Sequence, residues 1–306
     1  MRHVSFVDDN DVTLLESGTA FFPALIAAID AAEYDILFET YIFAEDETAR
    51  TVRNALIRAA LRGVKVRVLV DWIGTEHRPA TRLGAVLAEA GVQYRVFNPW
   101  CKRGIARSHR KIVVVDRAVA FVGGINVNDD WQCDHADRHR LPAPRWDFTV
   151  RVAGPLVAQI HDEAQGQWLR AGRLKLKQRI ELFKEMRKEP PQSCAHPARA
   201  AFVVRDNLRN RSTIQRAYLQ ALGRARESVL LATPYFAPGR KFRKALAHAA
   251  RRGVQVTLLI GVGEFRIQDM VAHSFYPKLL QDGIRVVEYQ KTQLHAKVAV
   301  VDGDWA

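Results

Sequence analysis

The chain has 306 residues, 48% of them hydrophobic, which is enough for two domains that each bury a core. Its formal net charge of +13 favours anionic partners such as phospholipid headgroups, nucleic acid or other phosphate esters, although a generally basic surface would carry the same charge. The three scattered cysteines exclude a disulfide framework and indicate a reducing compartment, and without an apolar run of roughly 18 to 20 residues any membrane contact is expected to be peripheral.

The first half of the chain alternates between apolar strands and amphipathic helices. Residues 36–43 form an apolar strand that ends in Thr-Tyr-Ile-Phe, and residues 59–70 read as a helix end, a glycine cap at Gly63 and a second strand. Residues 89–92 then lead into a third, short strand. Because mostly apolar strands that alternate with helices are buried on both sides, this half is predicted to be an α/β layer with helices on both sheet faces.

The first motif that carries chemistry is His109-x-Lys111, followed by Asp116 in the same β-branched run. Residues i and i+2 of a strand point to one face, so a titratable nitrogen lies beside a fixed positive charge. Asp116 ends the strand, where aspartate is favoured in a turn, and is predicted to organise the backbone rather than to react. In Gly123-Gly124-Ile125-Asn126 the glycines permit close approach to a phosphate, and the amide can donate a hydrogen bond to it.

No metal site is predicted in the chain. Cys133, His135 and His139 come closest to a set of ligands. The stretch 132–140 is polar and loop-like, however, and Asp134 and Arg138 are interleaved with these residues. This composition is typical of a loop.

A basic segment separates the two halves. Residues 170–188 carry eight Lys or Arg and an apolar stripe, which fits either an amphipathic helix at a membrane surface or a solvated helix packed on the body of the protein. Glu189-Pro190-Pro191 ends this helix. We therefore place a first lobe at residues 1–170, the basic helix and a linker at 171–199, and a second lobe at 200–306.

The second half of the chain repeats the first. Residues 229–236, 249–260 and 281–284 match the three units described above in the same order. His295-x-Lys297, followed by Asp302, then repeats the motif at the equivalent place. The duplication predicts two similar lobes, each a mixed β-sheet flanked by helices, with the active site at their interface. Two independent lobes are the alternative.

Two His-x-Lys pairs suit phosphoryl transfer. One imidazole can attack phosphorus while a second protonates the leaving oxygen, and the lysines stabilise charge on the non-bridging oxygens. Two structural histidines on core strands are the alternative, but the equivalent positions of the motifs in an internal repeat favour catalysis. We therefore predict that His109 and His295 reach one phosphorus atom.

The two motifs, with Gly-Gly-x-Asn after the first, resemble the signature of the phospholipase D superfamily. Further stretches resemble its bacterial cardiolipin synthase branch, and they are Arg107–Lys111, Phe121–Asn126, Gly154-Pro155, Thr233–Phe236 and Leu294–Lys297. The resemblance implies two phospholipase D-like lobes and a cardiolipin synthase-like phosphatidyltransferase without N-terminal membrane spans. It implies neither a metal nor an organic cofactor.

The resemblance also implies roles for individual residues. His109 would be the nucleophile that forms a phosphatidyl-histidine intermediate, and His295 would be the acid and base. The substrate phosphate would be bound by Lys111, Lys297 and Asn126, together with the backbone at Gly123 and Gly124.

The chain departs from the family pattern at two places. Where the family tends to have Trp-Arg-Asp, with a carboxylate that orients the first histidine, this chain has Arg145-Trp146-Asp147, and we assign that role to Asp147. After Asp302 the pattern implies a further strand and a Gly-Ser-x-Asn element, whereas the sequence ends at Ala306. The resemblance therefore implies a C-terminally truncated form with weak activity or none.

The expected reaction forms cardiolipin from phosphatidylglycerol and a second phospholipid or alcohol. It would take place on the cytoplasmic side of the cell membrane, where the chain would bind anionic lipid peripherally, with Trp72, Trp100 and Trp131 as candidates for interfacial contact. A phospholipase D-type phosphodiesterase or nuclease and an inactive remnant that only binds membranes are the alternatives. Nucleic acid is not the expected partner, because small nucleases of this type carry one motif and dimerise.

Overall fold

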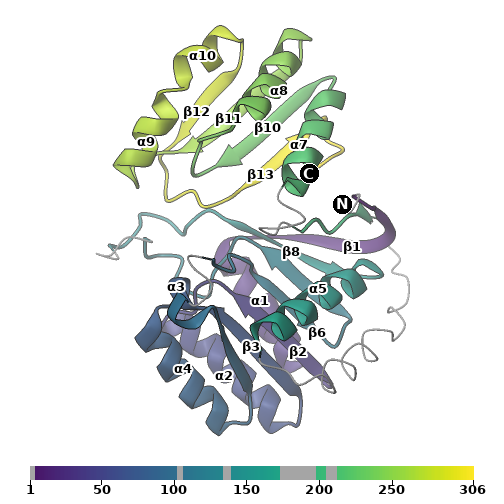
Figure 1. Cartoon of the computed structure of the whole chain (residues 1–306), viewed down its shortest axis with the longest axis vertical. Coiled ribbons are helices and arrows are strands. Elements are labelled where there is room, and N and C mark those ends of the chain that lie inside the picture. The colour runs from purple at the N-terminus through teal and green to yellow at the C-terminus, as the bar shows by residue number, and fades with distance from the viewer. Residues whose placement is uncertain (1–3, 102–105, 134–138, 173–197, 205–211) are drawn as a thin grey trace. The chain divides into compact units, whose positions relative to one another are not determined.

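The computed structural model describes residues 4–101, 106–133, 139–172, 198–204 and 212–306. Its residues group into two compact units (Figure 1). The larger unit comprises residues 6–130 and 148–202, and the smaller unit comprises residues 1–5, 131–147 and 203–306. The sequence predicts residues 131–147 in the first lobe, whereas the structure groups them with the second half of the chain. Except for its ends, the predicted basic helix and linker at 171–199 lies outside the described residues.

The larger unit is built on a mixed eight-stranded sheet. Across the sheet the strands are β4 (Gln93–Phe97), β3 (Lys65–Asp71), β2 (Asp35–Thr40), β6 (Ile112–Val115), β7 (Val119–Gly123), β8 (Phe148–Ala153), β1 (Val7–Glu16) and β9 (Ala198–Ala200). Strands β2, β3 and β4 are parallel, and the other neighbours are antiparallel. The helices are α1 (Ser17–Asp30), α2 (Glu47–Leu61), α3 (Trp72–Thr75), α4 (His77–Glu89) and α5 (Leu156–Ala171), with a 3-10 turn, η1, at Pro99–Cys101.

Local sequence signals explain where α2 begins and ends. Asp46 caps the first turn, because its side chain accepts a hydrogen bond of 2.9 Å from the Ala49 N–H. After the last turn Gly63 has a φ of +92°, a left-handed conformation that glycine adopts without a Cβ clash. Between these ends Val52 and Leu56 are fully buried one turn apart, so one face of the helix packs on the sheet.

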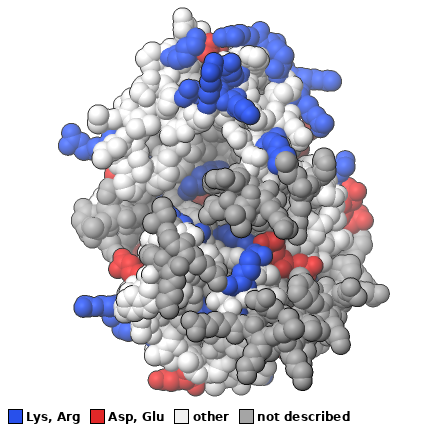
Figure 2. Space-filling model, viewed as in Figure 1, with Lys and Arg blue, Asp and Glu red and all other residues white. Residues whose placement is uncertain are grey.

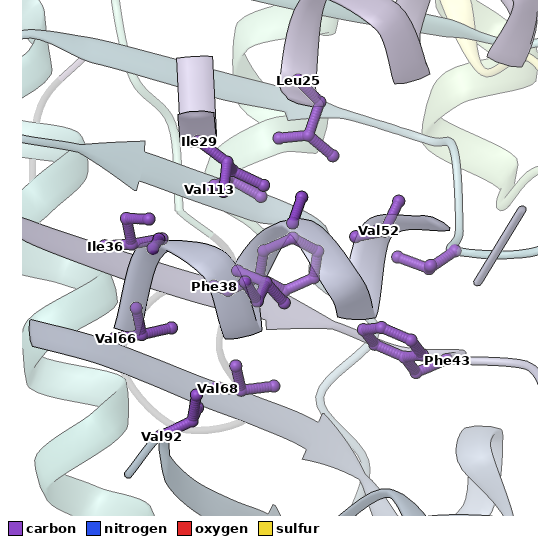
Figure 3. Close-up of a cluster of buried hydrophobic side chains, with 14 of the residues drawn as sticks. Leu25, Ile29, Ile36, Phe38, Phe43, Val52, Val66, Val68, Val92 and Val113 are labelled. Atoms are coloured by element: carbon purple, nitrogen blue, oxygen red, sulfur yellow. The ribbon is translucent and has the colours of Figure 1, made fainter. Parts of the chain in front are cut away.

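Hydrophobic side chains cover both faces of the larger sheet. On one face α1 and α2 contribute to a cluster in which Leu25, Phe38 and Val68 are buried (Figure 3). On the other face α5 covers Leu37 and Val114, which pair across β2 and β6 and are 3% and 1% exposed. Burial on two sides confirms the predicted α/β layer with helices on both sheet faces.

His161, on α5, is buried beside a permanent positive charge. Its Nδ1 accepts hydrogen bonds from the Arg117 guanidinium, at 3.2 Å from Nε and 3.1 Å from Nη2. The Asp162 carboxylate lies 3.6 Å from the same nitrogen, but it also lies 3.8 Å from Arg117 and so is shared with the guanidinium. Burial first, and then the Arg117 charge, lower the pKa of His161 to about 3.

This pKa predicts a loss of stability in acid. Below about pH 6.5 the unfolded chain binds a proton on His161 that the folded chain does not bind until about pH 3, so the free energy of unfolding falls as the pH falls through this range. Between pH 7 and pH 4.5 the free energy of unfolding should fall in both proteins. We expect the fall to be about 2 to 3 kcal/mol smaller in His161→Gln than in the wild type. Urea denaturation at both pH values measures this difference, and parallel losses in the two proteins would contradict the prediction.

The smaller unit repeats half of the larger sheet. Its strands, in order, are β12 (Arg285–Tyr289), β11 (Gln255–Gly261), β10 (Ser228–Thr233) and β13 (Val298–Val301). Its helices are α7 (Thr213–Arg224), α8 (Arg240–Arg251), α9 (Arg266–His273) and α10 (Tyr276–Gln281). Strands β10, β11 and β12 are parallel and β13 runs antiparallel to β10, which is the arrangement of β2, β3, β4 and β6. The sequence repeat is therefore also a repeat of structure.

The aspartates of the two motifs make the same contacts in the two sheets. The Asp116 carboxylate accepts hydrogen bonds of 2.8 Å from three consecutive backbone N–H groups, those of Glu33, Tyr34 and Asp35. The Asp302 carboxylate accepts bonds of 2.8 to 2.9 Å from the N–H groups of Arg226, Glu227 and Ser228. These donors lower the pKa of Asp302. Each aspartate thus ties the end of its motif strand to the start of the neighbouring strand.

The two sheets differ in how their second face is covered. Leu230 and Val300 pair across β10 and β13 as Leu37 and Val114 pair across β2 and β6. They are 52% and 37% exposed, whereas α5 buries the equivalent pair. In the described part of the chain no helix takes the place of α5 on this face, and none is long and apolar enough to span a bilayer.

Candidate active site

In the larger unit, His109 and Lys111 contact each other just before β6. The sequence predicts both on a strand, but β6 begins at Ile112, so the pair lies in the segment that leads into the strand. Lys111 Nζ is 3.2 Å from Nδ1 and 3.4 Å from Nε2 of His109. The ring of Tyr41 lies 4.4 Å from the imidazole and 5.1 Å from Nζ. The lysine is buried and the histidine is exposed, so the fixed charge lies behind a ring that solvent can reach.

Ser108, the residue before His109, is held from three sides. Its N–H donates to Asp71 Oδ2 at 2.6 Å, and its hydroxyl donates to Glu39 Oε1 at 2.6 Å. Gln167 on α5 donates to the same hydroxyl at 3.3 Å. These bonds fix the backbone that carries the histidine. The sequence motifs do not point to Glu39 and Asp71, although an acidic residue within or at the end of a largely apolar strand is a signal that could have found both.

Both carboxylates of this clamp are buried. Burial raises the pKa of Glu39, an effect that Arg110, 3.7 Å away, opposes. Burial also raises the pKa of Asp71, against the lowering effect of its backbone hydrogen bonds. The equivalent residues in the smaller unit are Ala232 and Gly261, so this polar clamp belongs to the first motif alone.

The glycines after the first motif serve the packing of the sheet. The Gly123 N–H donates to the Lys111 carbonyl at 3.3 Å, and the Gly124 N–H donates to the Phe148 carbonyl at 2.9 Å. A Cβ on Gly123 would lie 2.5 Å from the Phe148 carbonyl oxygen, too close for any side chain. The two N–H groups are therefore engaged within the protein, which differs from the phosphate contact predicted for them. Asn126 is buried, and its Oδ1 accepts a hydrogen bond of 3.3 Å from the Ile42 N–H.

In the smaller unit, His295 is paired with a carboxylate. Its Nδ1 lies 2.6 Å from Asp147 Oδ2, and both side chains are buried. An ionised carboxylate can only accept a hydrogen bond, so Nδ1 carries a proton and Nε2 is the nitrogen that can give up or take up a second one. The sequence predicts that Asp147 orients His109, whereas the structure places this carboxylate on the histidine of the second motif.

Asp147 reaches His295 because the residue before it, Trp146, is bonded to the segment that leads into β13. The Trp146 N–H donates to the Gln293 carbonyl, and the His295 N–H donates to the Trp146 carbonyl, both at 2.9 Å. The Trp146 ring stacks on Tyr289 of β12, with 4.9 Å between ring centroids and 25° between the planes. A ladder of backbone bonds and a stacked aromatic pair therefore set the distance from the carboxylate to the imidazole.

Lys297 follows His295 and is exposed. Its Nζ donates to the His295 carbonyl at 2.5 Å and lies 5.9 Å from the centre of the Tyr235 ring. The two motif lysines therefore differ, because Lys111 is buried against its histidine while Lys297 extends to the surface beside an aromatic ring.

The candidate metal ligands of the sequence are only partly described. Cys133 Sγ lies 3.2 Å from His139 Nδ1, and His135 lies outside the described residues. Among the residues that the structure describes, no three His, Cys, Asp or Glu side chains group in a way that could hold a metal ion.

Comparisons with known proteins agree on the family. Residues 25–135 and 218–306 match the family model of the cardiolipin synthase, PLD-like domain. Cardiolipin synthase B of Salmonella typhimurium is 37% identical over 98% of this chain and 71% of its own length, and that of Escherichia coli K12 is 34% identical over 99% and 72%. A solved structure, phosphatidylserine synthase of Haemophilus influenzae, shares the fold with a TM-score of 0.66 at 14% identity, over 95% of this chain and 76% of that one. The chain thus belongs to the cardiolipin synthase family of phospholipase D-like phosphatidyltransferases.

Proposed function

We propose that the chain forms cardiolipin by transferring a phosphatidyl group from phosphatidylglycerol to a second phospholipid or alcohol. The observation that carries this proposal is the repeat of one motif, a histidine two residues before a lysine, ahead of the equivalent strand in two similar sheets. The names of the relatives supply the substrate class. The net charge of +13 suits an anionic membrane, and we propose peripheral binding on its cytoplasmic side.

The proposed reaction has two displacement steps at one phosphorus atom. In the first, one histidine attacks phosphorus, the bond to the glycerol headgroup breaks, and the second histidine protonates the departing oxygen. In the second, the acceptor hydroxyl gives its proton to that second histidine and attacks phosphorus, which breaks the phosphorus–nitrogen bond and frees the first. The lysines and Asn126 bind the phosphate oxygens throughout.

We assign the nucleophile to His109 and the acid and base to His295. The His109 ring is exposed and lies against Lys111, a cation that can stabilise charge on the phosphate while the ring attacks phosphorus. A carboxylate against His295 Nδ1 stabilises the imidazolium that forms when Nε2 takes up a proton. The different partners of the two histidines thus support different roles.

Labelled phosphatidylglycerol in vesicles tests the proposal. We expect labelled cardiolipin and, after a rapid acid-free quench, a labelled phosphohistidine in the wild type but not in His109→Ala. Plasmid DNA serves as the competing substrate in a parallel assay. Cleavage of DNA without turnover of lipid would replace the proposal with a nuclease, and lack of turnover with both substrates would favour a chain that only binds membranes.

A further inference from the structure

An apolar stripe is exposed on α9 of the smaller unit. Ile267, Met270 and Val271 follow the i, i+3, i+4 spacing of one helix face and are 78%, 71% and 40% exposed. Three neighbouring large apolar side chains on one short helix are unusual for a surface in contact only with water.

The opposite side of α9 is attached to the body of the unit. Ala272 is 2% exposed, the Gly263 N–H donates to the Asp269 carboxylate at 3.0 Å, and His273 Nε2 lies 2.9 Å from Glu288 Oε1. These contacts set the rotation of the helix about its axis. The stripe therefore faces outward because the polar side of the helix is already bonded.

Aromatic rings connect α9 to the second motif. Phe265 immediately precedes the helix, and its ring lies 5.8 Å from that of Tyr235 in an edge-to-face contact. The Tyr235 ring in turn lies 5.9 Å from Lys297 Nζ. Two neighbouring aromatic rings thus lie between the start of α9 and Lys297, which is proposed above to bind phosphate.

We propose that α9 inserts this stripe into the surface of a lipid bilayer, so that the phosphate of a membrane lipid lies within reach of Lys297. The inference rests on the proposed function, because only a lipid substrate needs a path from a membrane to the motif. A basic side chain lies near the end of the helix, where Arg243 is 4.7 Å over the ring of Phe275, two residues after α9. Figure 2 shows further Lys and Arg side chains over the unit that contains α8 and α9.

The stripe differs from the surface expected from the sequence. Of the three tryptophans considered there, Trp131 is 38% exposed and Trp100 is 65% exposed. Trp100 packs in tilted contacts against Trp72 and His77 in the larger unit, and the three centroid distances are 4.6 to 4.9 Å. Vesicle binding by Trp100→Asp therefore distinguishes a membrane contact through the tryptophans from one through the stripe on α9.

Co-sedimentation with vesicles of phosphatidylglycerol and phosphatidylcholine tests the inference. We expect the double variant Ile267→Asp, Met270→Asp to bind vesicles at least about tenfold more weakly than the wild type, because two apolar side chains no longer leave water. Leu61→Asp, at a 74% exposed leucine of α2, is the matched control and should bind as the wild type does. Circular dichroism checks that each variant is folded.

Turnover separates this inference from the proposed function. The double variant should lose activity on vesicles and keep it on short-chain phosphatidylglycerol dispersed in detergent. The protein could bind vesicles through the stripe and yet turn over neither the vesicle lipid nor the short-chain lipid. That result would refute the proposed function but support the stripe as a membrane-binding surface. The inference would be overturned if the double variant bound vesicles as the wild type does, or if only Trp100→Asp lost binding. It would also be overturned if the wild type did not bind vesicles, or if the stripe formed a dimer in the absence of lipid.

Discussion

Replacement of either His109 or His295 by alanine is expected to lower the rate of phosphatidyl transfer by at least about a thousandfold. Each histidine has one role that the other does not fill, since nucleophilic attack and protonation of the leaving oxygen occur in the same step. When two groups act in the same step, removal of one abolishes the contribution of both. The double variant should therefore be hardly slower than either single variant. Initial rates on labelled phosphatidylglycerol measure these effects.

A substrate analogue with a good leaving group distinguishes the two roles. p-Nitrophenol departs without a proton, so a phosphatidyl-p-nitrophenol should still give a burst of p-nitrophenolate with His295→Ala but none with His109→Ala. His248→Ala, at an exposed histidine of α8, is the control and should keep wild-type rates. If each unit catalysed the reaction by itself, either single variant would retain about half of the activity, which would contradict the proposed division of roles between the two histidines.

Replacement of Asp147 by asparagine should lower kcat by about 100- to 10,000-fold while the protein stays folded. The amide has nearly the shape of the carboxylate but carries no charge to stabilise the imidazolium, and it can hold the ring in the wrong tautomer. The 2.6 Å contact with His295 predicts that the loss falls on proton transfer. The p-nitrophenyl analogue should therefore restore the first step in this variant, as it does for His295→Ala.

Two measurements keep this prediction distinct from simple damage to the fold. The urea midpoint of Asp147→Asn should change far less than its rate. Asp30→Asn, which weakens an exposed ion pair with Arg58, should leave the rate unchanged. If the analogue failed to give a burst with Asp147→Asn, the carboxylate would serve the nucleophile instead, as the sequence predicts.

Local patterns in the sequence were sufficient to predict the internal repeat, the alternation of strands and helices, and the two His-x-Lys pairs. The period of apolar residues is set by neighbours within one turn or one strand, and a His-x-Lys pair is visible in the sequence although both pairs lie just before their strands. The turn aspartates are local in the same sense, because Asp116 and Asp302 each end a strand. Their backbone donors, however, lie more than 70 positions earlier in the chain.

Only the tertiary structure decided which groups surround each histidine. Asp147 and His295 are 148 positions apart, and they meet because Trp146 forms backbone hydrogen bonds with Gln293 and His295. The clamp on Ser108 also depends on groups far apart in the sequence, since Glu39 and Asp71 lie on β2 and β3. Hydrophobic periodicity carries no information about such pairs, since it reports burial and not partners. For the same reason the sequence did not predict the exposed stripe on α9. Its exposure follows from hydrogen bonds that hold the opposite face of the helix against the unit.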